Sequence, residues 1–374
     1  MNKHLEIKII HTTDVHGKFF PYDFINSCKR NGSLARVSTY VKRLRKEYSE
    51  RLILLDGGDI LQGQPTCYYC NYINTEKTNV AAKVINLMEY DAQTIGNHDI
   101  ETGHKVYDKY CLETNCDILA ANAIDTNSLK PYFKPYKMME IDGLRIAIIG
   151  MLTPTISHWL NEQLWSGMKF EGIPESMDKW TRHVREVEHA NIVIGLFHSG
   201  FEGGINDNGI RENQSIETAA NVAGIDLILC GHDHRLKKTT QTFGYTKKIN
   251  IINPSSNANY ISESTITANR TQSGWQLDGI ESNIVNVEDE TPDEEFLSHF
   301  TEDIEEVKKY VNRIIGTIEK SIFTKDSFFG PAPFSDFIHD VQMETTGADI
   351  SLNAPLQFDA CIKKGEIHVS DMFN

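Results

Sequence analysis

Short apolar runs alternate with amphipathic stretches over the first 290 residues of the chain. Five apolar runs stand out, at residues 7–10, 52–55, 92–95, 191–197 and 226–230. Short runs of this kind, rich in Ile, Leu and Val and bounded by Gly, Asp or other polar residues, predict buried strands. Three stretches carry apolar residues at helical spacing and predict helices, at residues 33–48, 79–90 and 177–190. This alternation of strands and helices predicts a layered α/β domain.

The pattern changes towards the carboxyl-terminal end of this region. Residues 245–285 resemble successive antiparallel strands joined by polar turns, which predicts a mixed sheet. An acidic stretch, 287–296, contains a proline and predicts a linker or surface loop. A helix is expected over about Asp293–Val311. We therefore expect three parts, which are a domain over 1–290, a linker with its helix over 291–314, and a smaller α+β unit over 315–374 that is too short to bury a core alone.

Composition narrows the class of protein. The chain has 374 residues and a formal net charge of −15, so it has no basic surplus to bind a nucleic-acid backbone. Small anionic substrates remain possible, because bound divalent metals can reverse the local field. No apolar run approaches the roughly 18 residues of a membrane span. The start, MNKHLEIKII, lacks a secretory leader, so we expect a cytoplasmic protein, or a periplasmic or extracellular one if this start is incomplete.

The seven cysteines do not form a recognisable framework. Their number is odd and their spacing irregular, which argues against a disulfide scaffold. Cys67 and Cys70 form a lone CxxC without a second pair. A loop disulfide or two ordinary thiols therefore explains them better than a zinc knuckle does.

Side chains that can bind metals follow each of the five apolar runs. In chain order they are Asp14, His16, Asp59, Asn97, His98, His198, His232 and His234. The carboxyl ends of strands in an open α/β sheet converge on one crevice, so these residues are expected to form one site. A two-metal site needs a bridging oxygen ligand as well as terminal donors. Asp14, His16 and His234 could surround one metal; Asn97, His198 and His232 could surround the other, with Asp59 bridging. These mixed donors suit zinc, manganese or iron.

The ordered motifs DxH, GGD, GNHD, HSG and GHDH resemble those of the calcineurin-like metallophosphoesterase superfamily. The resemblance is narrower to its 5′-nucleotidase and 2′,3′-cyclic-nucleotide phosphodiesterase branch, through IIHTTDVHG (9–17), LLDGGDILQG (54–63), TIGNHD (94–99) and ETAANVAGIDLILCGHDH (217–234). It implies a four-layer α/β/β/α sandwich with mixed sheets over residues 1–290, the catalytic domain. It also implies that residues 315–374 begin a substrate-binding domain, and that the seven ligands bind two divalent metals in the arrangement given above.

The resemblance also implies roles beside the metals. His98 would contact the phosphoryl oxygens and assist the leaving group, with Asn97 beside it at the substrate. The aspartate that pairs with this histidine in the family is replaced by Glu101, while Asp99 is adjacent to His98, so either carboxylate could be the partner. In the second domain, SLNAPLQFDA (351–360) keeps an asparagine of the family's nucleotide-binding turn, Asn353, but lacks its glycines and arginine. We favour a truncated domain over an altered pocket, because the ending IHVSDMFN resembles the middle of that domain.

The expected activity is hydrolysis of a phosphate ester by attack of metal-bound hydroxide, with a 5′-nucleotide giving nucleoside and phosphate. A 2′,3′-cyclic nucleotide, a UDP-sugar or a thiosulfate ester are alternative substrates for the same metal core. A non-catalytic metal- or nucleotide-binding module is an alternative of another class, and so is a redox enzyme centred on Cys67 and Cys70. The sequence indicates no nucleic-acid partner and leaves the oligomeric state open.

Overall fold

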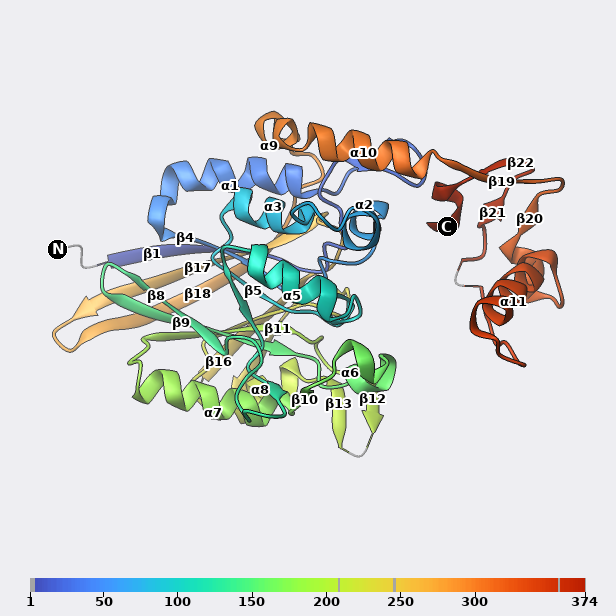
Figure 1. Cartoon of the computed structure of the whole chain (residues 1–374). Helices are drawn as coiled ribbons and strands as arrows, with labels where there is room; N and C mark the ends of the chain where they lie inside the picture. Colours follow the sequence, from blue (N-terminus) through green and yellow to red (C-terminus); the bar gives the residue numbers. More distant parts are fainter. Residues whose placement is uncertain (1–3, 208, 245–246, 356, 374) are drawn as a thin grey trace. The chain divides into compact units, whose positions relative to one another are not determined.

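Two six-stranded sheets lie face to face in the larger of two compact units (Figure 1). The computed structural model describes residues 4–207, 209–244, 247–355 and 357–373. The larger unit comprises Met1–Tyr22 and Lys29–Thr301, and the smaller unit comprises Asp23–Cys28 and Glu302–Asn374. The boundaries expected at residues 290 and 314 remain predictions.

The first sheet has the strand order β18-β17-β1-β4-β5-β6. Its strands are β1 (His4–Thr12), β4 (Leu52–Asp56), β5 (Ala92–Thr94), β6 (Asp117–Leu119), β17 (Tyr260–Thr271) and β18 (Gly274–Asn286). The strands β1, β4, β5 and β6 are parallel, whereas β17 pairs antiparallel with both β1 and β18. The carboxyl ends of β1, β4 and β5 therefore meet at one edge.

The second sheet has the strand order β15-β16-β14-β11-β9-β8. Its strands are β8 (Tyr136–Ile141), β9 (Leu144–Leu152), β11 (Ile192–His198), β14 (Leu227–Cys230), β15 (Leu236–Phe243) and β16 (Lys247–Pro254). Both sheets are mixed, as predicted. The expectation of antiparallel strands throughout 245–285 was wrong for β16, which pairs antiparallel with β15 but parallel with β14. Its placement beside β14 depends on a pairing between distant segments, which local sequence does not specify.

Helices cover the outer face of each sheet. They include α1 (Leu34–Tyr48) and α3 (Val80–Met88) over the first sheet, and α7 (Ile173–Glu186) and α8 (Ser215–Asn221) over the second (Figure 1). Between the sheets, alternate strand residues such as Ile7, Ile53, Ile148 and Ile194 are fully buried in one apolar cluster. Because successive strand residues point to opposite faces, the intervening residues pack against the helices instead. The four-layer α/β/β/α sandwich is thus confirmed.

Two helix predictions need correction at their ends. The helix α7 begins at Ile173 instead of residue 177, with Pro174 in its first turn, where the missing N–H of proline costs nothing. The single helix expected over Asp293–Val311 is two helices, α9 (Glu294–His299) and α10 (Thr301–Val311). The chain leaves helical geometry at Phe300, with φ −114° and ψ 12°.

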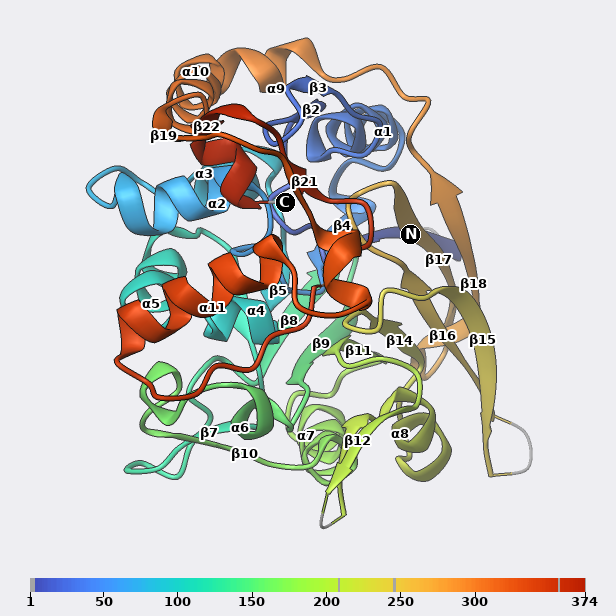
Figure 2. The same cartoon turned by 90° about the vertical axis from the view of Figure 1, so that its right-hand side faces the viewer.

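The smaller unit contains most of helix α10, two short strand pairs and the helix α11 (Pro333–Thr346) (Figure 2). Strand β19 (Ile314–Ile318) pairs with β22 (Gly365–His368), and β20 (Ile322–Phe323) pairs with β21 (Cys361–Ile362). No residue of α11 is buried. Among the described residues, no helix is both long enough and apolar enough to cross a membrane.

The remaining elements are short. They are β2 (Tyr22–Asp23), β3 (Cys28–Lys29), β7 (Ala123–Asp125), β10 (Met168–Phe170), β12 (Gly203–Asp207), β13 (Ile210–Asn213), α2 (Pro65–Tyr68), α4 (Asn97–Ile100), α5 (His104–Glu113) and α6 (Ile156–Trp159).

Candidate metal centre

The loops after β1 and β4 run side by side and carry the first candidate ligands. The amide of Asp14 donates to the carbonyl of Gly58 at 2.9 Å, and the amide of His16 donates to the carbonyl of Asp59 at 2.9 Å. His198 is the last residue of β11, and His232 and His234 follow β14. All of these segments leave their sheets at carboxyl ends of strands, as the sequence predicted.

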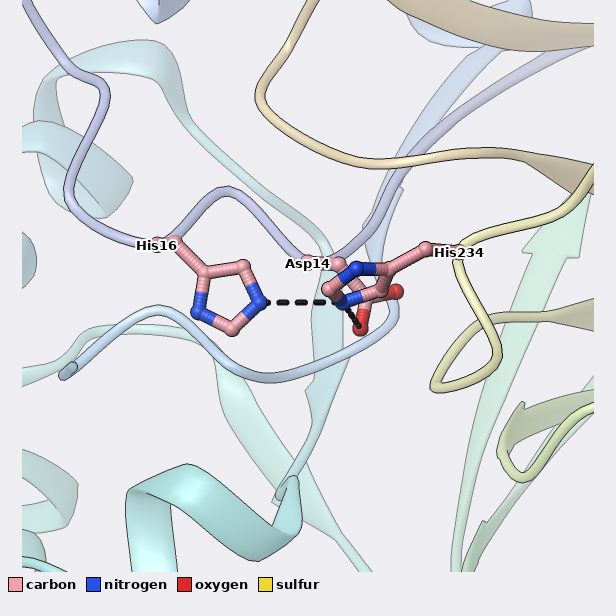
Figure 3. A group of neighbouring side chains, drawn as sticks. All are labelled: Asp14, His16 and His234. Atoms are coloured by element: carbon pink, nitrogen blue, oxygen red, sulfur yellow. Dashed lines mark hydrogen bonds and ion pairs between the residues drawn. The ribbon is translucent and has the colours of Figure 1, made fainter. Parts of the chain in front are cut away.

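One group of ligand atoms comes from Asp14, His16 and His234, and these atoms all lie within 4.8 Å of one another (Figure 3). The Nε2 atoms of His16 and His234 are 3.1 Å apart, and Nε2 of His234 is 3.2 Å from Oδ1 of Asp14. Two imidazole nitrogens at this distance need either one shared proton or a cation between them. The arrangement therefore fits a metal ion bound by these three side chains.

A second group consists of Asp14, Asp59 and His198, all buried and again within 4.8 Å of one another. Nε2 of His198 lies 3.1 Å from Oδ2 of Asp59 and 3.0 Å from Oδ1 of Asn97. The ring of His232 lies 5.2 Å from that of His198, measured between centroids. The structure thus brings all seven predicted ligands together, with Asp59 close to His198.

Buried charge explains why this cluster favours a cation. Burial alone would raise the pKa of Asp59, but the charge of His198 and its hydrogen bond lower that pKa below its ordinary value. Burial likewise disfavours the charged form of His198, yet Asp59 raises the pKa of His198 to about 10. The buried carboxylates of the cluster therefore require a positive partner, which a protonated His198 or a bound cation can supply.

The candidate metal groups found among the described residues contain no cysteine. Cys67 is buried, and its Sγ donates to the carbonyl of Ile60 at 3.3 Å. Burial raises the pKa of the Cys67 thiol well above its ordinary value, so the reactive thiolate is disfavoured. Cys67 is therefore poorly suited to the redox chemistry considered as an alternative.

Five of the seven candidate ligands share an unusual backbone conformation that the sequence did not reveal. Asp14, His16, Asp59, His232 and His234 have φ values of 51°, 49°, 57°, 73° and 52°. Residues other than glycine rarely adopt this left-handed region, and each such residue costs on the order of 1–3 kcal/mol. The surrounding structure must therefore hold these five residues in place.

Two glycines allow the loops to approach this closely. A Cβ on Gly96 would lie 2.1 Å from Oδ1 of Asp59, and a Cβ on Gly231 would lie 2.0 Å from Oγ1 of Thr13. Both distances are far shorter than any real contact of a Cβ. A side chain at either position would therefore push the neighbouring loops apart.

The two carboxylates near His98, those of Glu101 and Asp99, have different contacts. Nδ1 of His98 is 2.5 Å from Oε2 of Glu101, and both side chains are partly exposed. Although burial opposes it, the contact with Glu101 and the charge of Asp59 raise the pKa of His98. Asp99 is buried, and its carboxylate accepts hydrogen bonds from the amides of Asp59, Gly96, Ile60 and Leu61 at 2.8–2.9 Å. The structure therefore pairs His98 with Glu101, whereas Asp99 holds the backbone of the site.

Two residues near the centre were missed by sequence analysis. Glu212, on β13, places Oε1 2.9 Å from Nε2 of His232. The ring of Trp159, at the end of α6, lies 5.5 Å from the ring of His232 at an interplanar angle of 38°. Neither residue follows an apolar run in a recognisable motif, so no signal in the sequence pointed to them.

Asn353 belongs to the smaller unit, where it lines a cavity of about 260 Å³ together with residues such as Thr324, Phe334 and Ile338. Its predicted role in substrate binding remains a prediction.

Comparison with known proteins identifies relatives of the chain. Residues 7–236 match the family model described as Calcineurin-like phosphoesterase. The trifunctional nucleotide phosphoesterase protein YfkN of Bacillus subtilis is 26% identical over 352 residues, which are 87% of this chain and 24% of that protein. The 2′,3′-cyclic-nucleotide 2′-phosphodiesterase/3′-nucleotidase of Yersinia enterocolitica is 23% identical over 370 residues, which are 91% of this chain and 56% of that protein. The chain thus spans about a quarter and about half of these two relatives.

A solved structure shows the same fold. The crystal structure of a putative 5′-nucleotidase from Staphylococcus aureus has a TM-score of 0.80 to this chain at 22% identity, covering 98% of this chain and 71% of that one.

Proposed function

The chain belongs to the calcineurin-like phosphoesterase family, and from that premise we propose that it hydrolyses phosphate esters of nucleotides at the cluster around Asp59. Members of this family use a binuclear metal centre. The observation that carries the proposal is the convergence of donor atoms from Asp14, His16, Asp59, His198 and His234, which come from segments far apart in the sequence and include two imidazole nitrogens 3.1 Å apart.

We assign Asp14, His16 and His234 to one metal and Asn97, His198 and His232 to the other, with Asp59 between them. Bound divalent metals would lower the pKa of water and neutralise negative charge on the phosphoryl group. The carboxylate, amide and imidazole donors suit zinc, manganese or iron.

The protein's own contribution to chemistry centres on His98. Glu101 accepts from Nδ1, so the proton on Nε2 is available to a phosphoryl oxygen or to the leaving alkoxide. The raised pKa of His98 favours the charged imidazolium, which is the form that stabilises developing negative charge. Asn97 would meet the same phosphoryl group from the adjacent position.

The first candidate substrate is a 5′-nucleotide, by analogy with the putative 5′-nucleotidase whose fold this chain shares. A 2′,3′-cyclic nucleotide is a second candidate. It is supported by the Yersinia enterocolitica relative, whose name states that activity and whose alignment covers 91% of this chain.

A substrate panel tests the proposal. Protein treated with a chelator is reconstituted with zinc, manganese or iron, and is then assayed on 5′-AMP, 3′-AMP, 2′,3′-cyclic AMP, UDP-glucose, a thiosulfate ester and bis-p-nitrophenyl phosphate. We expect hydrolysis of at least one nucleotide ester that depends on metal and is lost in Asp59→Asn. A protein that binds two metals and cleaves none of these esters would contradict the proposal and favour a non-catalytic module.

A further inference from the structure

One ring nitrogen of His232 meets a carboxylate. Its Nε2 lies 2.9 Å from Oε1 of Glu212, and both side chains are largely buried, with 9% and 17% of their surfaces exposed. Neither Glu212 nor His232 supplies an atom to the two groups of converging ligand atoms. The Nε2 atom of His232 is therefore engaged by Glu212 and not by those groups.

The other imidazoles have backbone partners in the corresponding place. Nδ1 of His198 donates to the carbonyl of Gly57 at 2.6 Å, and Nδ1 of His16 lies 3.2 Å from the carbonyl of Gln62. In each of these rings the Nδ1 proton faces outward and Nε2 faces the cluster. In His232 the polar partner engages Nε2 instead, which leaves Nδ1 as the nitrogen available to a metal. Its partner also carries a full negative charge instead of a carbonyl dipole.

Glu212 is itself held firmly by several hydrogen bonds. Its Oε2 accepts from the amide of Ile205 at 2.7 Å, across the β12–β13 hairpin. Its backbone carbonyl accepts from Oγ1 of Thr153 and from Oγ of Ser199, each at 3.0 Å. These contacts hold both the side chain and the backbone of Glu212, so the position of its carboxylate beside His232 is part of the local structure.

The ring of His232 is also confined on its faces. Trp159 lies against it at 5.5 Å, and His198 meets it edge-on at 5.2 Å. The backbone amide of His232 donates to Oδ2 of Asp14 at 3.0 Å. With the ring confined in this way, the proton on Nε2 determines which nitrogen can offer a lone pair.

We propose that Glu212 is a positioning residue of the second metal site, which accepts the Nε2 proton of His232 and so directs the Nδ1 lone pair towards the metal. A ligating histidine commonly donates its other N–H to a carboxylate, which fixes the tautomer and increases the basicity of the ligand. The inference rests on the proposed function only in so far as that function requires two metals. It adds a residue that none of the metal-binding motifs contains.

Glutamine cannot replace this carboxylate. A glutamine has one acceptor oxygen, which can serve either Ile205 or His232, and its amide group would turn an N–H towards the other donor. Glu212→Gln therefore removes one of the two hydrogen bonds while keeping the shape of the side chain. Loss of an outer partner of this kind lowers metal affinity by about 10–100-fold.

The experiment measures binding of each zinc equivalent by competition with a chromophoric chelator. Glu212→Gln should weaken the second equivalent by about 10–100-fold and leave the first unchanged. Glu217→Gln is the matched control, because Glu217 lies on the neighbouring helix α8. It forms an ion pair with Arg211 at 3.3 Å and, among the described residues, has no hydrogen bond or ion pair with a candidate ligand. The control should bind both equivalents as the wild type does. Equal affinity for the second equivalent in wild type and Glu212→Gln would overturn the proposal, and so would equal weakening of both equivalents.

A second measurement does not depend on the variant folding. In zinc-loaded wild-type protein labelled with ¹⁵N-histidine, long-range ¹H–¹⁵N spectra report the tautomer of His232, assigned by its absence in His232→Gln. We expect a proton on Nε2 and a metal-bound Nδ1, and the opposite tautomer would overturn the proposal. A protein with these properties that cleaves no phosphoester would contradict the proposed function while leaving the role of Glu212 supported.

Discussion

Replacing Asp99 by asparagine tests whether this carboxylate holds the site or serves catalysis. Asp99 is buried, with 1% of its surface exposed, and its two oxygens accept four backbone N–H groups. Oδ2 receives the amides of Asp59 and Gly96, and Oδ1 receives those of Ile60 and Leu61. The single carboxylate thus ties the loop after β4 to the loop after β5.

The magnitude follows from the number of acceptors lost. Asparagine keeps one oxygen, which can serve one pair of amides, while its NH₂ group faces the other pair as a donor. Hydrogen bonds to a charged group contribute about 1.5–3 kcal/mol each, so losing two costs about 3–6 kcal/mol. Whole-protein stabilities are about 5–15 kcal/mol, so this would be a large fraction of the total.

The assay is urea unfolding of the larger unit, followed by tryptophan fluorescence, with a chelator present. A pH of 8 is chosen because burial raises the pKa of Asp99 to about 6, and the carboxylate must be charged. Asp125→Asn is the matched control, since Asp125 also accepts two backbone amides, from Asn127 and Ser128, but in an exposed turn. Water can replace those hydrogen bonds, so the control should lose much less stability.

Two results would refute this reasoning. If Asp99→Asn is no less stable than Asp125→Asn, the four hydrogen bonds do not hold the site. If its stability is unchanged but turnover falls, Asp99 assists His98 directly, and the pairing with Glu101 is not the functional one.

Three further predictions concern the metals, the chemistry and the core. Asp59→Asn should lower the occupancy of both metals in elemental analysis, because we assign Asp59 as the ligand that bridges them; loss of only one metal would remove its bridging role. His98→Asn should lower kcat by about 10²–10⁴-fold with near-normal metal content, and a parallel loss of metal would make His98 a ligand instead. Burial raises the pKa of Asp56 to about 7, so the folded state retains a proton that the unfolded state loses above about 3.8. Metal-free wild-type protein should therefore lose stability relative to Asp56→Asn as pH rises from about 4 to 7 in urea titrations; a difference between the two proteins that does not change with pH would contradict the assignment.

The strands, the main helices and the convergence of the ligands were predictable from sequence. Apolar runs such as LILL and NIVIGLF became β4 and β11 because each is buried between layers. The ligands after β1, β4 and β5 had to meet, as did those after β11 and β14, since parallel strands of one sheet end at the same edge. The packing of the two sheets brings these two edges together. The ordered motifs at these strand ends predicted the family, and the comparison confirmed that prediction.

What sequence could not supply depends on contacts between distant segments. The pairing of β16 with β14 and the end of helix α9 at Phe300 are decided by tertiary packing. The choice between Asp99 and Glu101 as partner of His98 required the direction of each side chain, because both lie within three residues of it. Glu212 reaches His232 only because the β12–β13 hairpin folds back on the end of β14.

The ligand residues with positive φ show how strongly the surrounding structure determines the site. Five donor residues occupy a backbone region that costs on the order of 1–3 kcal/mol each, and two buried carboxylates lie within the same cluster. Such a site persists only where neighbouring structure determines it completely. Asp99 fixes the loops after β4 and β5 by accepting four backbone amides. Gly96 and Gly231 have no side chains that would separate the loops. Nδ1 of His198 and Nε2 of His232 each have a defined hydrogen-bond acceptor. The surrounding structure therefore holds these donors in place, so binding energy need not be used to order them. That preorganisation is what a hydrolytic metal centre requires, because charge developing on a phosphoryl group is best stabilised by groups that do not have to move.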